Sequence, residues 1–324
     1  MLMTLNEAAE KIREGALLHI AGTEALLKAL PKGNWIGGST EYFMAKSGGK
    51  VSDDLLFVTL FPYKNFKIQT YGLDNIANVA ADGYDNGFSL VILPFDSGIH
   101  REYAENAAGY EDMFIKNVAG WVSGVNLNAT GQTAVAVNGL EAAAYPDKAA
   151  ALHLQVPDEK TVAINILNIF EQDENAPVME FAEEGFSIKN CVINGKEVNL
   201  ADYIAEKGIN TKLPLVGDYS GNGVNIAVKT IEKGTVSFYA PVFSGIKYRM
   251  AKNITDYEKE FNNQLANSIK ADEQVVFSCN CILNFLYGEL EGKHTDVFNG
   301  PITFGEIAYQ LVNQTLVYIS VYDK

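Results

Sequence analysis

The chain has 324 residues, enough for two domains that each bury a core of their own. Its 25 lysines and arginines against 40 acids give a net charge of −15, which repels nucleic-acid backbones and anionic membrane surfaces. Apolar residues make up 48% and charged residues 20%, a composition that excludes a wholly disordered chain. We therefore expect neither a nucleic-acid partner nor a membrane partner.

Cysteine usage and the first residues point to the inside of the cell. Cys191, Cys279 and Cys281 are an odd number of thiols without the spacing of a disulfide framework. No run approaches the roughly 18 apolar residues of a membrane span. Glu7 and Glu10 stand where a signal peptide would carry positive charge. The sequence predicts a soluble cytoplasmic protein.

The first half mixes helix and strand signals. Residues 1–30 are predicted to form a helical segment, with one helix over Leu5–Arg13 opened by a Thr4–Glu7 capping box. A second helix is expected after Thr23, which can cap it. Further along, the patterns indicate strands over 55–61, 89–93, 133–137 and 151–156 and a helical stretch between 95 and 120.

The acidic stretch 171–185, which includes Pro177, is typical of a solvated linker. It divides the chain into domains over 31–175 and 176–324. In the second half, the patterns predict a hairpin over 192–198, helices over 200–207, 256–268 and 306–312, and strands over 224–231, 235–242, 274–278 and 316–321. Strands outnumber helices without regular alternation. We therefore expect an α+β fold of two domains with mixed, largely antiparallel sheets and helices packed on outer faces.

A glycine-rich segment, 33–40, has the spacing of a P-loop, but Ser39 stands where the lysine of that motif belongs. Without that cation a triphosphate loses its main partner, so nucleotide binding is disfavoured. One remaining interpretation is a plain glycine turn. The other is a small polar ligand that approaches the backbone at Gly37 and Gly38 and meets the hydroxyls of Ser39 and Thr40.

The segment Ser278–Cys281 follows a strand pattern, so its two thiols at i and i+2 share one face. Cys279 could act as a nucleophile with His294 or His100 as base, or it could be a buried structural thiol beside Asn280. Its apolar neighbours favour burial. The spacing fits no zinc pattern, so we expect no metal and no cofactor.

Thr303 and Glu306 repeat the S/T-x-x-E pattern, which predicts a capping box at the start of the last helix. A functional interpretation is that the amides of this turn, with Phe304 and Gly305, hold a carboxylate while Glu306 holds an ammonium group. Arg101 is a further candidate, as a clamp for a carboxylate.

Nine segments of the chain carry a family resemblance: Ile36–Thr40, Leu90–Asp96, Val122–Gly124, Gln132–Gly139, Pro214–Val216, Ala240–Val242, Phe277–Cys279, Gly300–Ile307 and Asn313–Leu316. Together they resemble the FIST family, intracellular sensory proteins with an N-terminal and a C-terminal FIST domain. The resemblance assigns an N-terminal-like domain to 31–175 and a C-terminal-like domain to 176–324. Two departures are Glu41–Tyr42, where the family has a glycine–glutamate pair, and Cys281–Leu283, where it often has an arginine.

The resemblance implies a non-catalytic protein that binds or senses a small polar metabolite, with amino acids among the candidates. We expect its signal to pass to a separate signalling protein. Two alternatives stay open, a thiol-dependent amide or ester hydrolase using Cys279 and an interaction scaffold. The sensor requires the turns at 37–40 and 303–306 to face one cavity. The expected ligand-binding residues are Gly37, Gly38, Ser39, Thr40, Arg101, Cys279, Asn280, Thr303, Phe304, Gly305 and Glu306.

Overall fold

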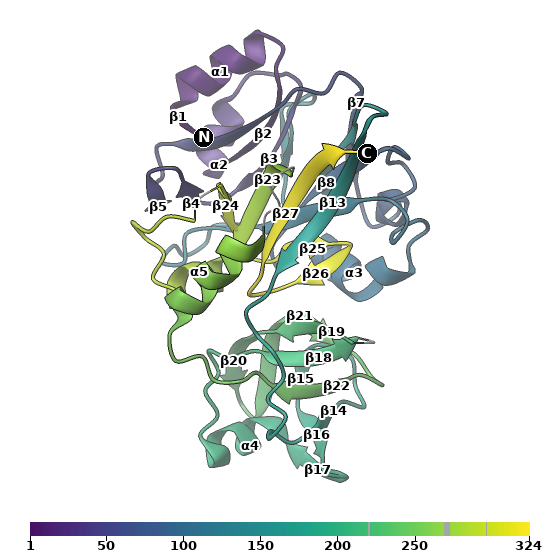
Figure 1. Cartoon of the computed structure of the whole chain (residues 1–324), viewed down its shortest axis with the longest axis vertical. Coiled ribbons are helices and arrows are strands. Elements are labelled where there is room, and N and C mark those ends of the chain that lie inside the picture. The colour runs from purple at the N-terminus through teal and green to yellow at the C-terminus, as the bar shows by residue number, and fades with distance from the viewer. Residues whose placement is uncertain (220, 269–272, 296) are drawn as a thin grey trace. The chain divides into compact units, whose positions relative to one another are not determined.

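The computed structural model describes residues 1–219, 221–268, 273–295 and 297–324. Contacts between residues divide the chain into two compact units. Unit 1 consists of Met1–Leu167, Leu265–Leu311 and Leu316–Lys324, and unit 2 of Asn168–Gln264 and Val312–Thr315. Both units combine sheets with helices (Figure 1), which confirms the α+β class. No helix within the described ranges is long and apolar enough to cross a membrane.

Unit 1 holds three six-stranded sheets, in the orders β1-β6-β2-β3-β10-β11, β26-β25-β9-β8-β12-β7 and β13-β27-β23-β24-β4-β5. The pairs β2–β3, β8–β9 and β23–β24 are parallel, and most others are antiparallel, as predicted. The strands are β1 Leu2–Met3, β2 Leu17–Gly22, β3 Trp35–Ser39, β4 Tyr42–Ala45, β5 Gly48–Val51, β6 Leu56–Phe61, β7 Phe66–Tyr71, β8 Gly87–Pro94, β9 Val118–Ser123, β10 Ala136–Asn138, β11 Ala143–Tyr145, β12 Ala149–Gln155, β13 Lys160–Leu167, β23 Gln274–Cys281, β24 Gly300–Thr303, β25 Glu306–Ala308, β26 Gln310–Val312 and β27 Leu316–Asp323.

Two helices near the N-terminus build a core against the first sheet. The capping box predicted for α1 forms, with the Thr4 side chain on the Glu7 amide and the Glu7 carboxylate on the Thr4 amide, and Thr23 caps α2. The apolar side of α1 packs with β2 and β3 in one cluster that includes Ile12, Leu18 and Trp35. The helices of this unit are α1 Leu5–Arg13, α2 Glu24–Ala29, α3 Gly98–Asn106 and α6 Ile282–Tyr287, with 3-10 turns Ile76–Asn78 and Ala107–Gly109.

Unit 2 holds a six-stranded sheet in the order β17-β16-β14-β22-β18-β19 and a three-stranded sheet in the order β15-β21-β20. The predicted hairpin is β16–β17, and its turn residues Asn194 and Gly195 both have positive φ, as a tight hairpin turn requires. The elements are β14 Met179–Glu180, β15 Gly185–Ile188, β16 Asn190–Ile193, β17 Lys196–Asn199, β18 Leu215–Tyr219, β19 Asn222–Ile226, β20 Val228–Glu232, β21 Thr235–Val242, β22 Lys247–Met250 and α4 Leu200–Lys207, with α5 Tyr257–Ser268 running across the division at residue 264.

The two compact units differ from the division expected at 175/176. Residues 1–30 are not a helical segment of their own, because β2 lies inside the first sheet between β6 and β3. Leu265–Leu311 and Leu316–Lys324 return to unit 1, where β27 pairs with β13 and β24 pairs with β4. Pairing between strands far apart in the sequence therefore sets the units.

The helix predicted over 306–312 is a pair of strands. β25 pairs antiparallel with β9, and the positive φ of Tyr309 turns the chain into β26. Ile307, Ala308, Leu311 and Val312 are buried. The sequence spacing fits a helix start, but pairing with β9 satisfies the backbone of this segment instead.

Candidate functional site

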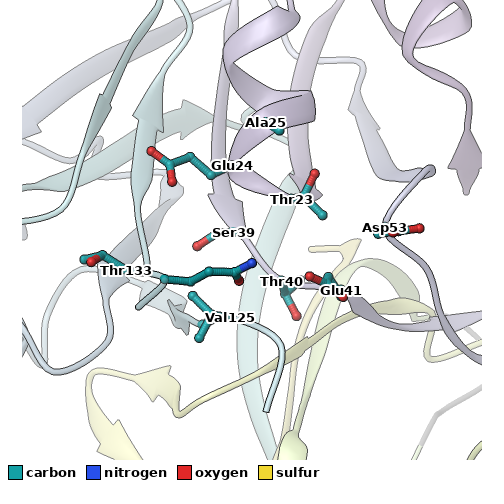
Figure 2. Close-up of a pocket in the computed structure, with 11 residues that line it drawn as sticks. Thr23, Glu24, Ala25, Ser39, Thr40, Glu41, Asp53, Val125 and Thr133 are labelled. Carbon is teal, nitrogen blue, oxygen red and sulfur yellow. The ribbon is translucent and has the colours of Figure 1, made fainter. Parts of the chain in front are cut away.

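A pocket of about 360 Å³ lies in unit 1 at the carboxyl ends of β2, β3 and β9, and we call it the Ser39 pocket (Figure 2). Thr23 directly follows β2, and Thr40 directly follows β3. Carboxyl ends of strands are common places for ligand sites, because the loops that leave them converge there. The lining residues are Thr23, Glu24, Ala25, Ser39, Thr40, Glu41, Asp53, Gly124, Val125, Gln132 and Thr133.

Backbone hydrogen bonds hold these strand ends together. The Thr40 amide donates to the Gly22 carbonyl over 2.9 Å, which joins β3 to β2. The Gly124 amide donates to the Ser39 carbonyl over 2.7 Å, and the Ser39 amide donates to the Val135 carbonyl over 3.0 Å. Hydrogen-bonded backbone therefore joins the ends of β2, β3 and β9 beside the pocket.

Two buried hydroxyls line the pocket. Thr40 Oγ1 donates to the Ile302 carbonyl over 2.8 Å and accepts from the Tyr42 amide, so its hydrogen bonds are filled. Ser39 Oγ accepts from the Val135 amide over 2.9 Å, and its own proton has no acceptor among the described residues. Ser39 is only 3% exposed.

Three carboxylates from separate segments complete the lining. Glu24 forms an ion pair with Lys28 one turn along α2, with the atoms 2.5 Å apart on a partly exposed surface. Glu41 accepts from the neutral Asn126 amide over 2.6 Å. Asp53 is exposed, in the connection between β5 and β6. The pocket thus combines negative charge with one buried, available hydroxyl proton.

The profile of DUF6976, a family of unknown function, matches residues 3–322. The chain belongs to this family. No curated protein matches the chain. Because the DUF6976 description names neither ligand nor activity, the FIST resemblance stays a prediction.

In this DUF6976 chain, Gly37 and Gly38 do not form an open turn for a ligand. Both lie inside β3, and a Cβ on Gly37 would be 2.6 Å from the Ile20 carbonyl oxygen. A Cβ on Gly38 would be 2.7 Å from Ile92 and from Trp121. The glycines let β3 approach its neighbours closely, and only Ser39 and Thr40 of the predicted segment reach the pocket.

The second predicted turn is not part of the Ser39 pocket. Glu306 is 0% exposed and lies at the start of β25, where its carboxylate accepts from Thr303 Oγ1 over 2.7 Å. Phe304 and Gly305 bond through their backbone to Val122 of β9. Since β25 is a strand, the turn has no helix N-terminus with free amides for an anion.

Cys279 and Asn280 are buried at the end of β23. The Cys279 thiol donates to the Gly120 carbonyl over 3.5 Å, and burial raises its pKa well above the ordinary value, with Glu306 contributing. A thiol in this state is a poor nucleophile. The burial of Cys279 agrees with the prediction from its apolar neighbours. Asn280 accepts from Asn284 over 2.9 Å.

Arg101 is exposed on α3 and does not line the pocket. The structure therefore brings together Ser39 and Thr40 with pocket residues that sequence reasoning did not select. Thr23 directly follows β2 and Gly124 directly follows β9, and Glu24, Glu41 and Val125 each lie two residues after the end of a strand. Recognising in the sequence that β2 and β3 pair in parallel would have placed Thr23 and Thr40 at the same edge of the sheet.

A second polar cluster joins side chains of β7, β8 and β12 to Asp82. Ser89 Oγ lies 2.7 Å from His153 Nδ1, His153 Nε2 lies 2.9 Å from Tyr71 Oη, and Tyr71 donates to Asp82 over 2.8 Å. These residue types occur in serine hydrolases, but Ser89 is 1% exposed. A Cβ on Gly83 would lie 2.9 Å from Ser89 Oγ, so Gly83 packs directly against the serine hydroxyl. Among the described residues, no group of three His, Cys, Asp or Glu side chains could hold a metal ion.

Proposed function

We propose that this protein is a non-catalytic intracellular binding protein that senses a small polar metabolite in the Ser39 pocket. The observation that carries the proposal is the Ser39 hydroxyl, which is buried, lines a pocket of about 360 Å³ and has no acceptor for its proton among the described residues. Ligand pockets of small molecules begin near this size and use a few fixed polar groups. The FIST resemblance implies the same class of function.

A binding protein of this kind transmits its state to a separate signalling partner in the cytoplasm. The hydrolase alternative has less support, because Cys279 is buried and its raised pKa keeps the thiol protonated. The scaffold alternative needs no pocket and gives no role to the Ser39 hydroxyl.

A thermal-shift screen of the full chain tests the proposal. The probes are the twenty amino acids and common small amines, acids and alcohols, each in excess over protein shown to be folded and free of carried-over ligand. A ligand at 100 times its Kd stabilises the folded state by about 2.7 kcal/mol, which shifts melting by several degrees. Ser39→Ala should remove the shift. No shift with any probe would leave the scaffold alternative ahead.

A further inference from the structure

The charge around the Ser39 pocket restricts the chemistry of its ligand. The polar lining consists of three carboxylates, four hydroxyls and one amide, and no lysine or arginine is among the eleven residues. A phosphate or carboxylate in this pocket would face Glu24, Glu41 and Asp53 without a cation to hold it. A cationic ligand would instead find partners on more than one side.

The three acids are not equally engaged. Glu24 already has Lys28 as a partner. The hydrogen bond to Glu41 comes from the amide of Asn126, which orients the carboxylate but leaves its negative charge uncompensated. Asp53 has no cationic partner among the described residues. Glu41 and Asp53 are therefore the acids with charge left for a ligand, and in the view of Figure 2 both lie on the same side of Ser39.

Ser39 supplies an independent requirement. Its oxygen accepts from the Val135 amide, so the hydroxyl can still donate one hydrogen bond, into a pocket where it is 3% exposed. A buried donor without an acceptor is unfavourable, and a ligand atom that accepts this proton removes the penalty. The ligand therefore needs an acceptor as well as a positive charge.

Resting on the proposed function, we propose that the Ser39 pocket binds a small primary amine that carries a neutral hydrogen-bond acceptor and no carboxylate, as an amino alcohol does. The ammonium group lies between Glu41 and Asp53, and the acceptor takes the Ser39 proton. This class is narrower than the amino acids expected from the sequence, because the carboxylate of an amino acid would have no cation in the lining. An ammonium ion has three donors, which suit carboxylates from separate segments.

Calorimetric titration of the full chain with matched probes tests this assignment. Ethanolamine has both the ammonium group and the hydroxyl acceptor, and serine adds a carboxylate to them. Ethylene glycol and glycolate keep a hydroxyl but lack the amine, and they are neutral and anionic, respectively. Ethylamine lacks the acceptor, and magnesium and calcium ions offer charge alone. We expect ethanolamine to bind at least tenfold more tightly than any of the others.

Variants connect the binding to the pocket. Glu41→Gln and Asp53→Asn should each weaken ethanolamine binding roughly tenfold or more, which corresponds to the loss of a charge-assisted hydrogen bond. Glu10→Gln removes an exposed acid of α1 that does not line the pocket and should leave affinity unchanged. Melting temperature, measured for each variant, separates loss of binding from loss of folding.

The outcomes distinguish this inference from the proposed function. If glycolate, serine or ethylene glycol binds best and Ser39→Ala removes that binding, the pocket is a ligand site and the amine assignment is wrong. If magnesium or calcium binds best at the same acids, the site takes an inorganic cation and the assignment is equally wrong. If the folded chain binds no probe of any class, the proposed function fails together with the inference.

Discussion

Trp121 donates its indole N–H to Nε2 of His19 over 2.9 Å. This bond makes Nε2 the acceptor, so the proton of the neutral imidazole resides on Nδ1, which has no hydrogen-bond partner among the described residues. Both side chains are 0% exposed. Burial, with a smaller contribution from the N-terminal ammonium group, lowers the pKa of His19 to about 3. A protonated His19 could not accept from Trp121, so the first and second sheets are joined through a histidine that must stay neutral.

This relationship predicts acid destabilisation at moderate pH. The pKa of His19 is about 3 and that of His153 about 4 in the folded chain, against about 6.5 for an unperturbed histidine. Between pH 6.5 and 4 the unfolded chain binds protons at both positions that the folded chain does not bind. The free energy of unfolding should therefore fall with falling pH, by roughly 1.4 kcal/mol per pH unit for each histidine. Urea unfolding from pH 7 to pH 4.5 measures this slope.

One variant separates the contribution of His19 from those of the acids that also titrate. His19→Gln keeps an acceptor for the Trp121 indole and should reduce the slope by the share of one histidine. Identical slopes in the wild type and in His19→Gln would contradict the prediction.

Gly38 should tolerate no side chain. A Cβ there would lie 2.7 Å from Ile92 Cγ2 and from the Trp121 ring, and both belong to the second sheet. Gly38→Ala should therefore lower the free energy of unfolding by about 1–3 kcal/mol, the usual cost of overpacking. Gly109→Ala is the matched control, since a Cβ there meets nothing within 4 Å. Equal stability of the two variants in urea would count against close packing at β3.

The sequence predicts the parts of the fold that depend on neighbouring residues, and Gly37 and Gly38 show where this stops. Helix caps at Thr4 and Thr23 and the Asn194–Gly195 turn were predictable, because their hydrogen bonds or backbone angles involve residues within a few positions. The spacing of Gly37 and Gly38 suggested a turn. Glycine is needed at these positions because β3 lies in close contact with β2, β8 and β9. Local sequence contains no information about such distant neighbours.

The same limit applies to the candidate site. Ser39 and Thr40 were selected for their hydroxyls, which depend on residue type alone. Glu41 and Asp53 were not selected. The β4–β5 hairpin, in which Tyr42 pairs with Val51, brings them to one end of the pocket, and their place near Thr23 requires the pairing of β3 with β2. The helix start predicted at Glu306 is wrong, since the S/T-x-x-E pattern occurs here at a turn between strands.

The cysteines should be unreactive in the folded protein. Cys191, Cys279 and Cys281 are all free and buried, and burial raises the pKa of Cys191 to about 11. We expect iodoacetamide at pH 7.5 to modify none of them within an hour, whereas all three should react after denaturation in urea. Mass spectrometry of the digested protein assigns the label. Fast native labelling at Cys279 would revive the hydrolase alternative.

Thr303 should matter for stability and not for ligand binding. It donates to the fully buried Glu306 carboxylate, so Thr303→Val leaves that acceptor without one of its bonds. We expect a loss of about 1–3 kcal/mol in the free energy of unfolding. Ethanolamine affinity should not change, because neither residue lines the Ser39 pocket. Thr230→Val, on an exposed strand position of unit 2, is the control. Weakened binding at unchanged stability would restore the turn at 303–306 as a ligand site.

The hydrogen-bonded side chains of Asp82, Tyr71, His153 and Ser89 should behave as one structural unit. Tyr71 Oη has two acceptors nearby, Asp82 at 2.8 Å and Gln69 at 2.9 Å, so it donates to the carboxylate and accepts from Nε2 of His153. Nδ1 then accepts from Ser89. Burial is the main cause that raises the pKa of Tyr71, and burial also lowers that of His153 to about 4, so both groups stay neutral near pH 7.

Tyr71→Phe removes the hydroxyl in the middle of this chain and leaves Nε2 of a buried histidine without a partner. The free energy of unfolding should fall by about 1–3 kcal/mol, whereas Tyr322→Phe should cost much less. Ser89→Ala combined with Tyr71→Phe should be non-additive by at least about 0.5 kcal/mol, because both side chains bond the same imidazole. A fluorophosphonate reagent should not label Ser89 in the folded chain, since the serine is buried and Gly83 lies against its hydroxyl. Additive losses would show that the chain is a set of separate contacts, and labelling of Ser89 would show that its cover opens and that the serine is a nucleophile.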